Sequence, residues 1–101
     1  MKFKYKNEII EVTTTQNKTI MKYRFQKLYY AIIIKDCNRY SSIANKQRLD
    51  VVMTDDNLTI LSVKLDMHEN TFVENTEATT TILLPVGSIK DLEIGQKFIL
   101  E

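Results

Sequence analysis

Residues 28–35 read Leu-Tyr-Tyr-Ala-Ile-Ile-Ile-Lys, and this stretch decides the fold class. A short apolar run that ends in three β-branched isoleucines is typical of a strand buried on both faces. Residues that favour a turn follow directly, at Asp36-Cys37-Asn38. We therefore expect Leu28–Lys35 to be the central strand of a β-sheet.

Shorter stretches on both sides of this run also have strand patterns, with turn residues between them. In the arm that follows Asp55-Asp56-Asn57, Ile60, Ser62 and Lys64 alternate with Leu61, Val63 and Leu65, which is the pattern of a half-buried strand. The other expected strands are Lys2–Lys6, Ile9–Thr13, Arg39–Ala44, Gln47–Thr54, a short piece at Phe72-Val73, Thr79–Leu84 and Gln96–Leu100. Together they predict a mainly β fold, a small antiparallel barrel- or sandwich-like domain.

Two segments have the pattern of short helices. Thr14 or Thr15 would cap a helix that reaches Phe25, and Ser88 would cap a single helical turn over Ser88–Leu92. The predicted fold class therefore includes one or two short helices beside the strands.

Length and composition predict one globular domain over residues 1–101. Apolar residues make up 44% and charged residues 27%, which argues against a disordered chain. The longest apolar run, Leu28–Ile34, is far shorter than the roughly 20 residues of a membrane-spanning helix. Lysines at positions 2, 4 and 6 interrupt any signal-peptide pattern. We expect a soluble, cytoplasmic protein without a membrane partner.

The near-neutral net charge of +1 combines two halves of opposite sign. Residues 1–50 carry eleven basic and four acidic side chains, whereas residues 51–101 carry three and nine. Such a split is found in nucleic-acid-binding and self-associating proteins. Strands from both halves must nevertheless share one core, so we expect the charges to mix in space.

The residues that carry chemistry are few. His68 is the only histidine, between Asp66 and Glu69, and no second His or Cys has ligand spacing beside it. Cys37 is the only cysteine, and its neighbour Asp36 would not activate it as a nucleophile. No phosphate-binding glycine loop or catalytic motif occurs. We therefore expect no metal site, no cofactor and no catalytic residues.

One segment, residues 18–30, combines cations with aromatic rings and contains no acid. Single-stranded nucleic acid is bound by such a mixture, because cations meet phosphates and rings stack on bases. The alternative is that the rings belong to the core and the cations to the opposite, solvated face. The candidate nucleic-acid residues are Lys22, Tyr23, Arg24, Phe25 and Lys27.

The second half of the chain resembles a known family. Four blocks follow one another in order: Arg48–Asp55 with its Leu-Asp pair, Leu58–Val63, Thr81–Leu92 with Leu-Pro-Val-Gly-Ser, and Ile94–Lys97. This succession resembles the bacterial and archaeal family called domain of unknown function 192, most specifically over residues 48–98. The resemblance implies a compact, mainly antiparallel β fold and no established activity.

The resemblance also indicates a candidate binding site. If the family has a functional face, Asn45, Lys46 and Asp50 would meet Gly87 and Ser88 around one concavity, where main-chain amides could bind a ligand. The family's aromatic-Met-Lys-Asn segment is represented only by Ser42–Lys46, without a Trp. This departure leaves the site altered or lost.

These observations favour a non-enzymatic binding or protein-interaction module, with self-association through strand edges as one form of it. The alternative is a nucleic-acid-binding domain that uses residues 18–30. An enzyme ranks third, and the sequence identifies neither ligand nor pathway.

Overall fold

The computed structural model describes residues 1–16, 27–43 and 45–101. These residues form nine strands and contain no helix. The strands are β1 (Lys2–Tyr5), β2 (Glu8–Gln16), β3 (Ala31–Lys35), β4 (Arg39–Ser41), β5 (Leu49–Thr54), β6 (Ile60–Met67), β7 (Phe72–Glu74), β8 (Thr80–Pro85) and β9 (Ile99–Leu100). The predicted mainly β fold class is confirmed.

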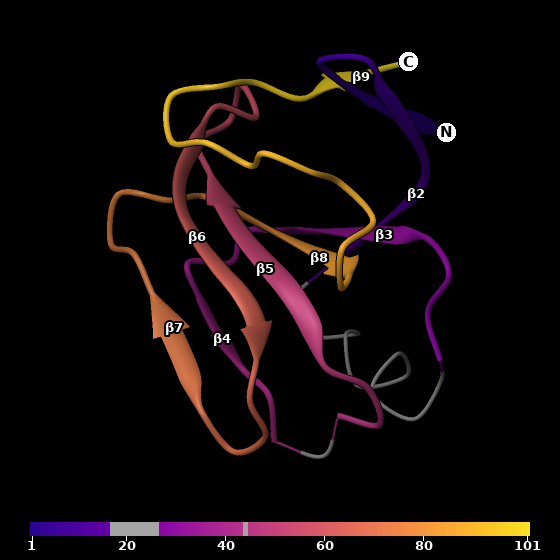
Figure 1. The fold of residues 1–101 in the computed structure, drawn as a ribbon. Helices are drawn as coiled ribbons and strands as arrows, with labels where there is room; N and C mark the ends of the chain where they lie inside the picture. The colour runs from indigo at the N-terminus through magenta and orange to yellow at the C-terminus, as the bar shows by residue number, and fades with distance from the viewer. Residues whose placement is uncertain (17–26, 44) are drawn as a thin grey trace.

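Seven strands form one curled sheet in the order β6-β5-β8-β3-β2-β1-β9 (Figure 1). The expected strands Lys2–Lys6 and Ile9–Thr13 pair as the hairpin β1–β2, and the strands on either side of Asp55-Asp56-Asn57 pair as the hairpin β5–β6. Every pair in this sheet is antiparallel except β2–β3, which is parallel. Parallel neighbours need a long connection, and 14 residues separate the end of β2 from the start of β3 in the sequence.

The C-terminal segment connects the two ends of this sheet. Residues 95–98 bond to the residues that precede and begin β6, through Gly95 N–H to Ile60 C=O (2.9 Å) and Phe98 N–H to Leu58 C=O (3.1 Å). The next two residues form β9 and pair with β1. The curled sheet is thereby closed at this corner, as the yellow segment in Figure 1 shows.

The inner face of the curled sheet holds one hydrophobic cluster. Phe98 packs in it against Phe3 and Tyr5, with ring centroids 4.9 and 5.1 Å apart. Ile33 and Val52 add aliphatic side chains from the central strands. All five side chains are buried, so the inner face is a packed core at the end where β1 turns into β2.

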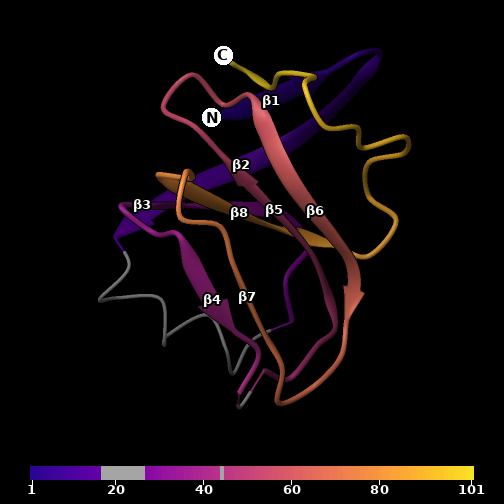
Figure 2. The same ribbon diagram turned by 90° about the vertical axis from the view of Figure 1, so that its left-hand side faces the viewer.

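The outer face holds a second cluster, which the two-stranded ribbon β4–β7 covers (Figure 2). Ile32 and Ile34 of β3 belong to this cluster, whereas Ala31 and Ile33 belong to the inner one. Alternate side chains of a strand point to opposite faces, and here both faces are covered. This arrangement confirms a central strand in the apolar run, but the strand begins at Ala31 and not at Leu28 as predicted.

The two halves of the sequence occupy neighbouring parts of the sheet. β1, β2 and β3 are adjacent, and so are β5, β6 and β8, with contact between β3 and β8. Each hydrophobic cluster nevertheless takes side chains from both halves, as expected for a shared core.

The predicted helical turn over Ser88–Leu92 is wrong. This segment is an irregular loop, in which Asp91 has a positive φ of 55°. Its main chain bonds to other parts of the protein, because the Tyr5 hydroxyl donates to Asp91 C=O (2.7 Å) and Lys90 N–H donates to the Glu8 carboxylate (2.7 Å). These bonds replace the hydrogen bonds of a helix.

The other helix was expected to begin at Thr14 or Thr15. Both threonines lie in β2, which continues to Gln16. The remainder of that predicted helix lies outside the described residues. In the described part of the chain, no helix has the length and apolar character needed to cross a membrane.

Candidate functional site

Asp50 and Gly87, two of the predicted site residues, are in direct contact. Asp50 is only 3% exposed, and one carboxylate oxygen accepts Gly87 N–H at 3.0 Å. The other oxygen accepts Asp66 N–H at 2.7 Å. Gly87 has a φ of +75°, which favours glycine over residues with a side chain. Asp50 therefore joins β5, β6 and the loop after β8.

The other three predicted residues lie outside this contact. The Asn45 amide nitrogen donates to the Tyr40 hydroxyl at 2.8 Å, and Lys46 is exposed. Ser88 does not cap a helix, and its buried hydroxyl makes no hydrogen bond within the described residues. The structure thus brings together two of the five residues.

A cavity of about 460 Å³ lies beside the Asp50–Gly87 contact, between the end of β6 and the loop 86–92. Its apolar lining includes Leu65, which is 60% exposed, and Val86. Asp66, Lys90 and Asp91 provide charged groups on the same lining. Neither Asn45, Lys46 nor Ser88 is among its lining residues.

The sequence pattern does not identify Leu65 as a residue of this cavity, because β6 departs from regular alternation. The pairing of β5 with β6 shifts register twice, between Leu49 and Val51 and between Met53 and Thr54. Such bulges turn side chains to new directions. As a result, Leu61 packs on the outer cluster, and Val63, expected on the same face, packs on the inner one.

β6 is an edge strand along most of its length (Figure 2). Thr54 C=O accepts Thr79 N–H, so by alternation the main chain of Val52 also faces β8. Val63 lies opposite Val52, and its N–H and C=O therefore point away from β5. Leu65 lies between Lys64, which pairs with Val51, and Asp66, whose N–H donates to Asp50 of β5, so the main-chain groups of Leu65 also face away from β5. Within the described chain, no turn or loop hydrogen bond is made to them.

Arg48 and Asp66 form an ion pair near the C-terminal end of β6. The Arg48 guanidinium lies 2.9 Å from the Asp66 carboxylate and 3.1 Å from a ring nitrogen of His68. His68 is exposed. No group of three potential metal ligands occurs among the residues that the structure describes. The groups described in this region can form hydrogen bonds, ion pairs and strand pairing with a partner.

Cys37 is buried, and its thiol lies 3.1 Å from Arg39 C=O.

Of the candidate nucleic-acid residues, Lys22, Tyr23, Arg24 and Phe25 lie outside the described residues. Lys27 is exposed, and its ammonium lies 5.6 Å from the ring centroid of Tyr29. Tyr29 is 76% exposed, whereas Tyr30 packs on the outer cluster. One aromatic ring of this segment is therefore a surface ring beside a cation.

The comparisons with known proteins give the fold alone. No family model matches the chain, and no curated protein matches it. The chain is similar to the crystal structure of a protein of unknown function from Novosphingobium aromaticivorans DSM 12444, with a TM-score of 0.76 and 8% sequence identity. The match covers 92% of this chain and 76% of the other. The two proteins share a small β-rich fold, and the resemblance to domain of unknown function 192 stays a prediction.

Proposed function

We propose that this domain is a non-enzymatic interaction module that binds an extended peptide segment of another protein along β6. One observation carries this proposal: the edge of β6 that faces away from β5 ends at Leu65, which lines an open cavity with apolar residues in its wall. A peptide that adds a strand to a sheet edge uses main-chain hydrogen bonds for affinity and side-chain pockets for specificity. The cavity at Leu65 and Val86 would take an apolar side chain of that peptide.

A second copy of this chain fits the same edge less well. If two β6 strands pair antiparallel through Val63 and Leu65, Lys64 of one copy lies opposite Lys64 of the other. Like charges directly opposite each other destabilise a strand pair. A peptide with a different sequence avoids this repulsion.

The test uses a random peptide display library on the immobilised domain, followed by affinity measurements with the selected peptides. Leu65→Pro removes the outward N–H without touching a bond to β5, because proline is tolerated where the N–H faces solvent. We expect Leu65→Pro to lose the selected peptides by more than tenfold. Leu65→Ile keeps both the N–H and the apolar wall of the cavity and should retain most of the affinity. Equal binding by the proline variant and the wild type would contradict strand addition.

We also propose that the chain is a member of the domain of unknown function 192 family. The proposal is supported by the contact between Asp50 and Gly87, because these residues belong to two separate blocks that carry the resemblance. Sequences of closer relatives would test it, since both residues should be retained together.

We also propose a cytoplasmic location, which can be checked by cell fractionation.

Nucleic-acid binding is the second candidate function, and the exposed Tyr29 beside Lys27 is the observation that favours it. If this ring stacks on a base, Tyr29→Ala should weaken binding of a labelled single-stranded oligonucleotide by roughly 1–3 kcal/mol and leave the melting temperature unchanged. Binding should also fall steeply as salt rises. No binding at low salt would eliminate this candidate.

A further inference from the structure

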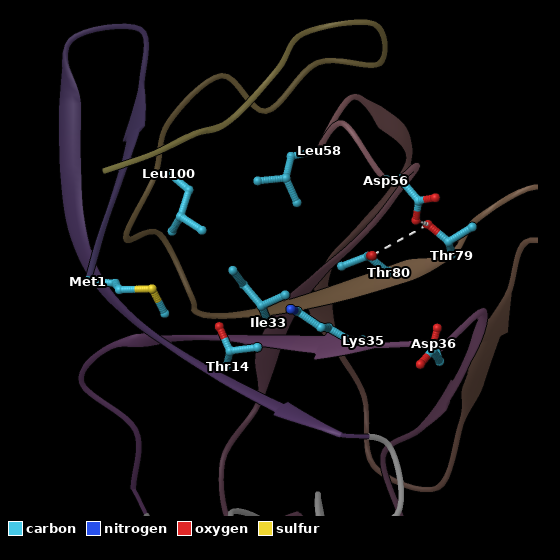
Figure 3. Close-up of a pocket in the computed structure, with 10 residues that line it drawn as sticks. All are labelled: Met1, Thr14, Ile33, Lys35, Asp36, Asp56, Leu58, Thr79, Thr80 and Leu100. Atoms are coloured by element: carbon cyan, nitrogen blue, oxygen red, sulfur yellow. Dashed lines mark hydrogen bonds between the residues drawn. The ribbon is translucent and has the colours of Figure 1, made fainter.

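A second cavity lies on the inner face of the sheet, away from the β6 edge. This cavity has a volume of about 590 Å³, and Figure 3 shows the residues that line it. Lys35 of β3 and Thr80 of β8 pair in register at this end of the sheet, and Ile33 lies on the same face as Lys35. Phe3 and Phe98 fill the inner face at the other end, whereas the side chains here are shorter or reach solvent.

The polar rim of this cavity is held in place by hydrogen bonds. The Thr79 hydroxyl donates to the Asp56 carboxylate at 2.6 Å and lies 3.5 Å from the Thr80 hydroxyl. Thr79 N–H donates to Thr54 C=O at 2.9 Å. In the turn that carries Asp56, the Asp55 carboxylate accepts two main-chain amides at 2.9 and 3.0 Å. The rim is therefore preorganised, which lowers the cost of binding.

The charges of the rim have opposite signs. Lys35 provides a cation that makes no ion pair within the described residues, and Asp36 and Asp56 provide two carboxylates. Ile33 and Leu58 supply apolar surface on the side of the cavity toward Met1 and Leu100, away from the two aspartates (Figure 3). The cavity thus offers an anion-binding group, cation-binding groups and an apolar wall within one space.

The geometry points to a site for a small zwitterionic ligand with an apolar substituent, of the class of apolar amino acids and dipeptides. Its carboxylate would meet Lys35, its ammonium group would meet Asp56 and Asp36, and its side chain would contact Ile33 and Leu58. Hydrogen bonds between charged groups are the strong ones in such sites. The volume lies within the range of small-molecule pockets, roughly 300–1,000 Å³. This ligand site is independent of peptide binding along β6.

The test uses three probes that differ by one charge each: leucyl-leucine, N-acetyl-leucyl-leucine and leucyl-leucinamide. Each is titrated into the labelled domain, and the methyl NMR signals of Ile33 and Leu58 report binding. We expect leucyl-leucine to bind at least about tenfold more tightly than either analogue, since each analogue loses a charge-assisted hydrogen bond. Lys35→Met should lose the preference for leucyl-leucine over leucyl-leucinamide. Lys64→Met, a matched change on the exposed part of β6, should bind all three probes as the wild type does.

Three results would overturn this assignment. They are the absence of methyl shifts with any probe at millimolar concentration, equal affinities for all three probes, and an unchanged preference in Lys35→Met. Lys35 is an exposed residue at the end of β3, so we expect Lys35→Met to fold like the wild type. An unchanged melting temperature would confirm this.

Discussion

At position 50 a carboxylate is almost entirely removed from water, and each of its oxygens accepts a main-chain N–H. A buried charge costs free energy unless its hydrogen bonds are satisfied. Here the satisfied bonds fix the loop at Gly87 relative to the β5–β6 hairpin. Asp50 is therefore a structural residue that shapes the cavity beside it.

Asp50→Asn should destabilise the protein by roughly 1–3 kcal/mol, because the amide nitrogen cannot accept and one of the two main-chain N–H groups that Asp50 binds loses its partner. The change in the free energy of unfolding can be measured by urea denaturation. Glu69→Gln, the same change of functional group at an exposed position, serves as the control and should cost less than about 0.5 kcal/mol. Equal stabilities of the two variants would mean that the Asp50 bonds contribute nothing.

The sequence allowed part of this site to be predicted. Asp50 and Gly87 were found because a resemblance placed them in one region. Leu65 was assigned to a half-buried face because strict alternation was assumed along residues 58–66. A bulge depends on the register between two strands, which a single sequence does not contain.

Among the predicted strands, the C-terminal one is only partly formed. Gln96–Leu100 was expected to be one strand, but only Ile99–Leu100 forms β9. The residues before it bond near the start of β6 instead, and Phe98 enters the inner cluster. One short segment therefore holds two ends of the sheet.

Phe98→Ala should cost roughly 3–5 kcal/mol, the range for removing a buried aromatic ring. The loss arises from the contacts with Phe3 and Tyr5 and from the cavity that remains. Denaturant unfolding measures the change, and amide exchange at Ile60 should become faster because its partner segment is released. Ile99→Ala changes the next, exposed residue and should have a much smaller effect. A similar loss in both variants would show that the segment is not anchored by Phe98.

For the whole molecule, the sequence predicted the strands far better than their arrangement. The strands were visible because apolar and β-branched residues alternate locally, as in Leu49, Val51 and Met53. The sheet order β6-β5-β8-β3-β2-β1-β9 and the parallel pair β2–β3 depend on contacts between residues far apart in the chain. Local patterns carry no information about which distant strands become neighbours.

The pairing of β1 with β9 has a consequence for protein synthesis. Phe3 pairs with Leu100, so the ribosome must synthesise all the residues between them before β1 finds its second neighbour. At ordinary translation rates the N-terminal hairpin waits for roughly 5–20 s with one edge uncovered. During that time Phe3 and Tyr5 lack the ring of Phe98, and the uncovered strand is a target for chaperones or for pairing with other nascent chains.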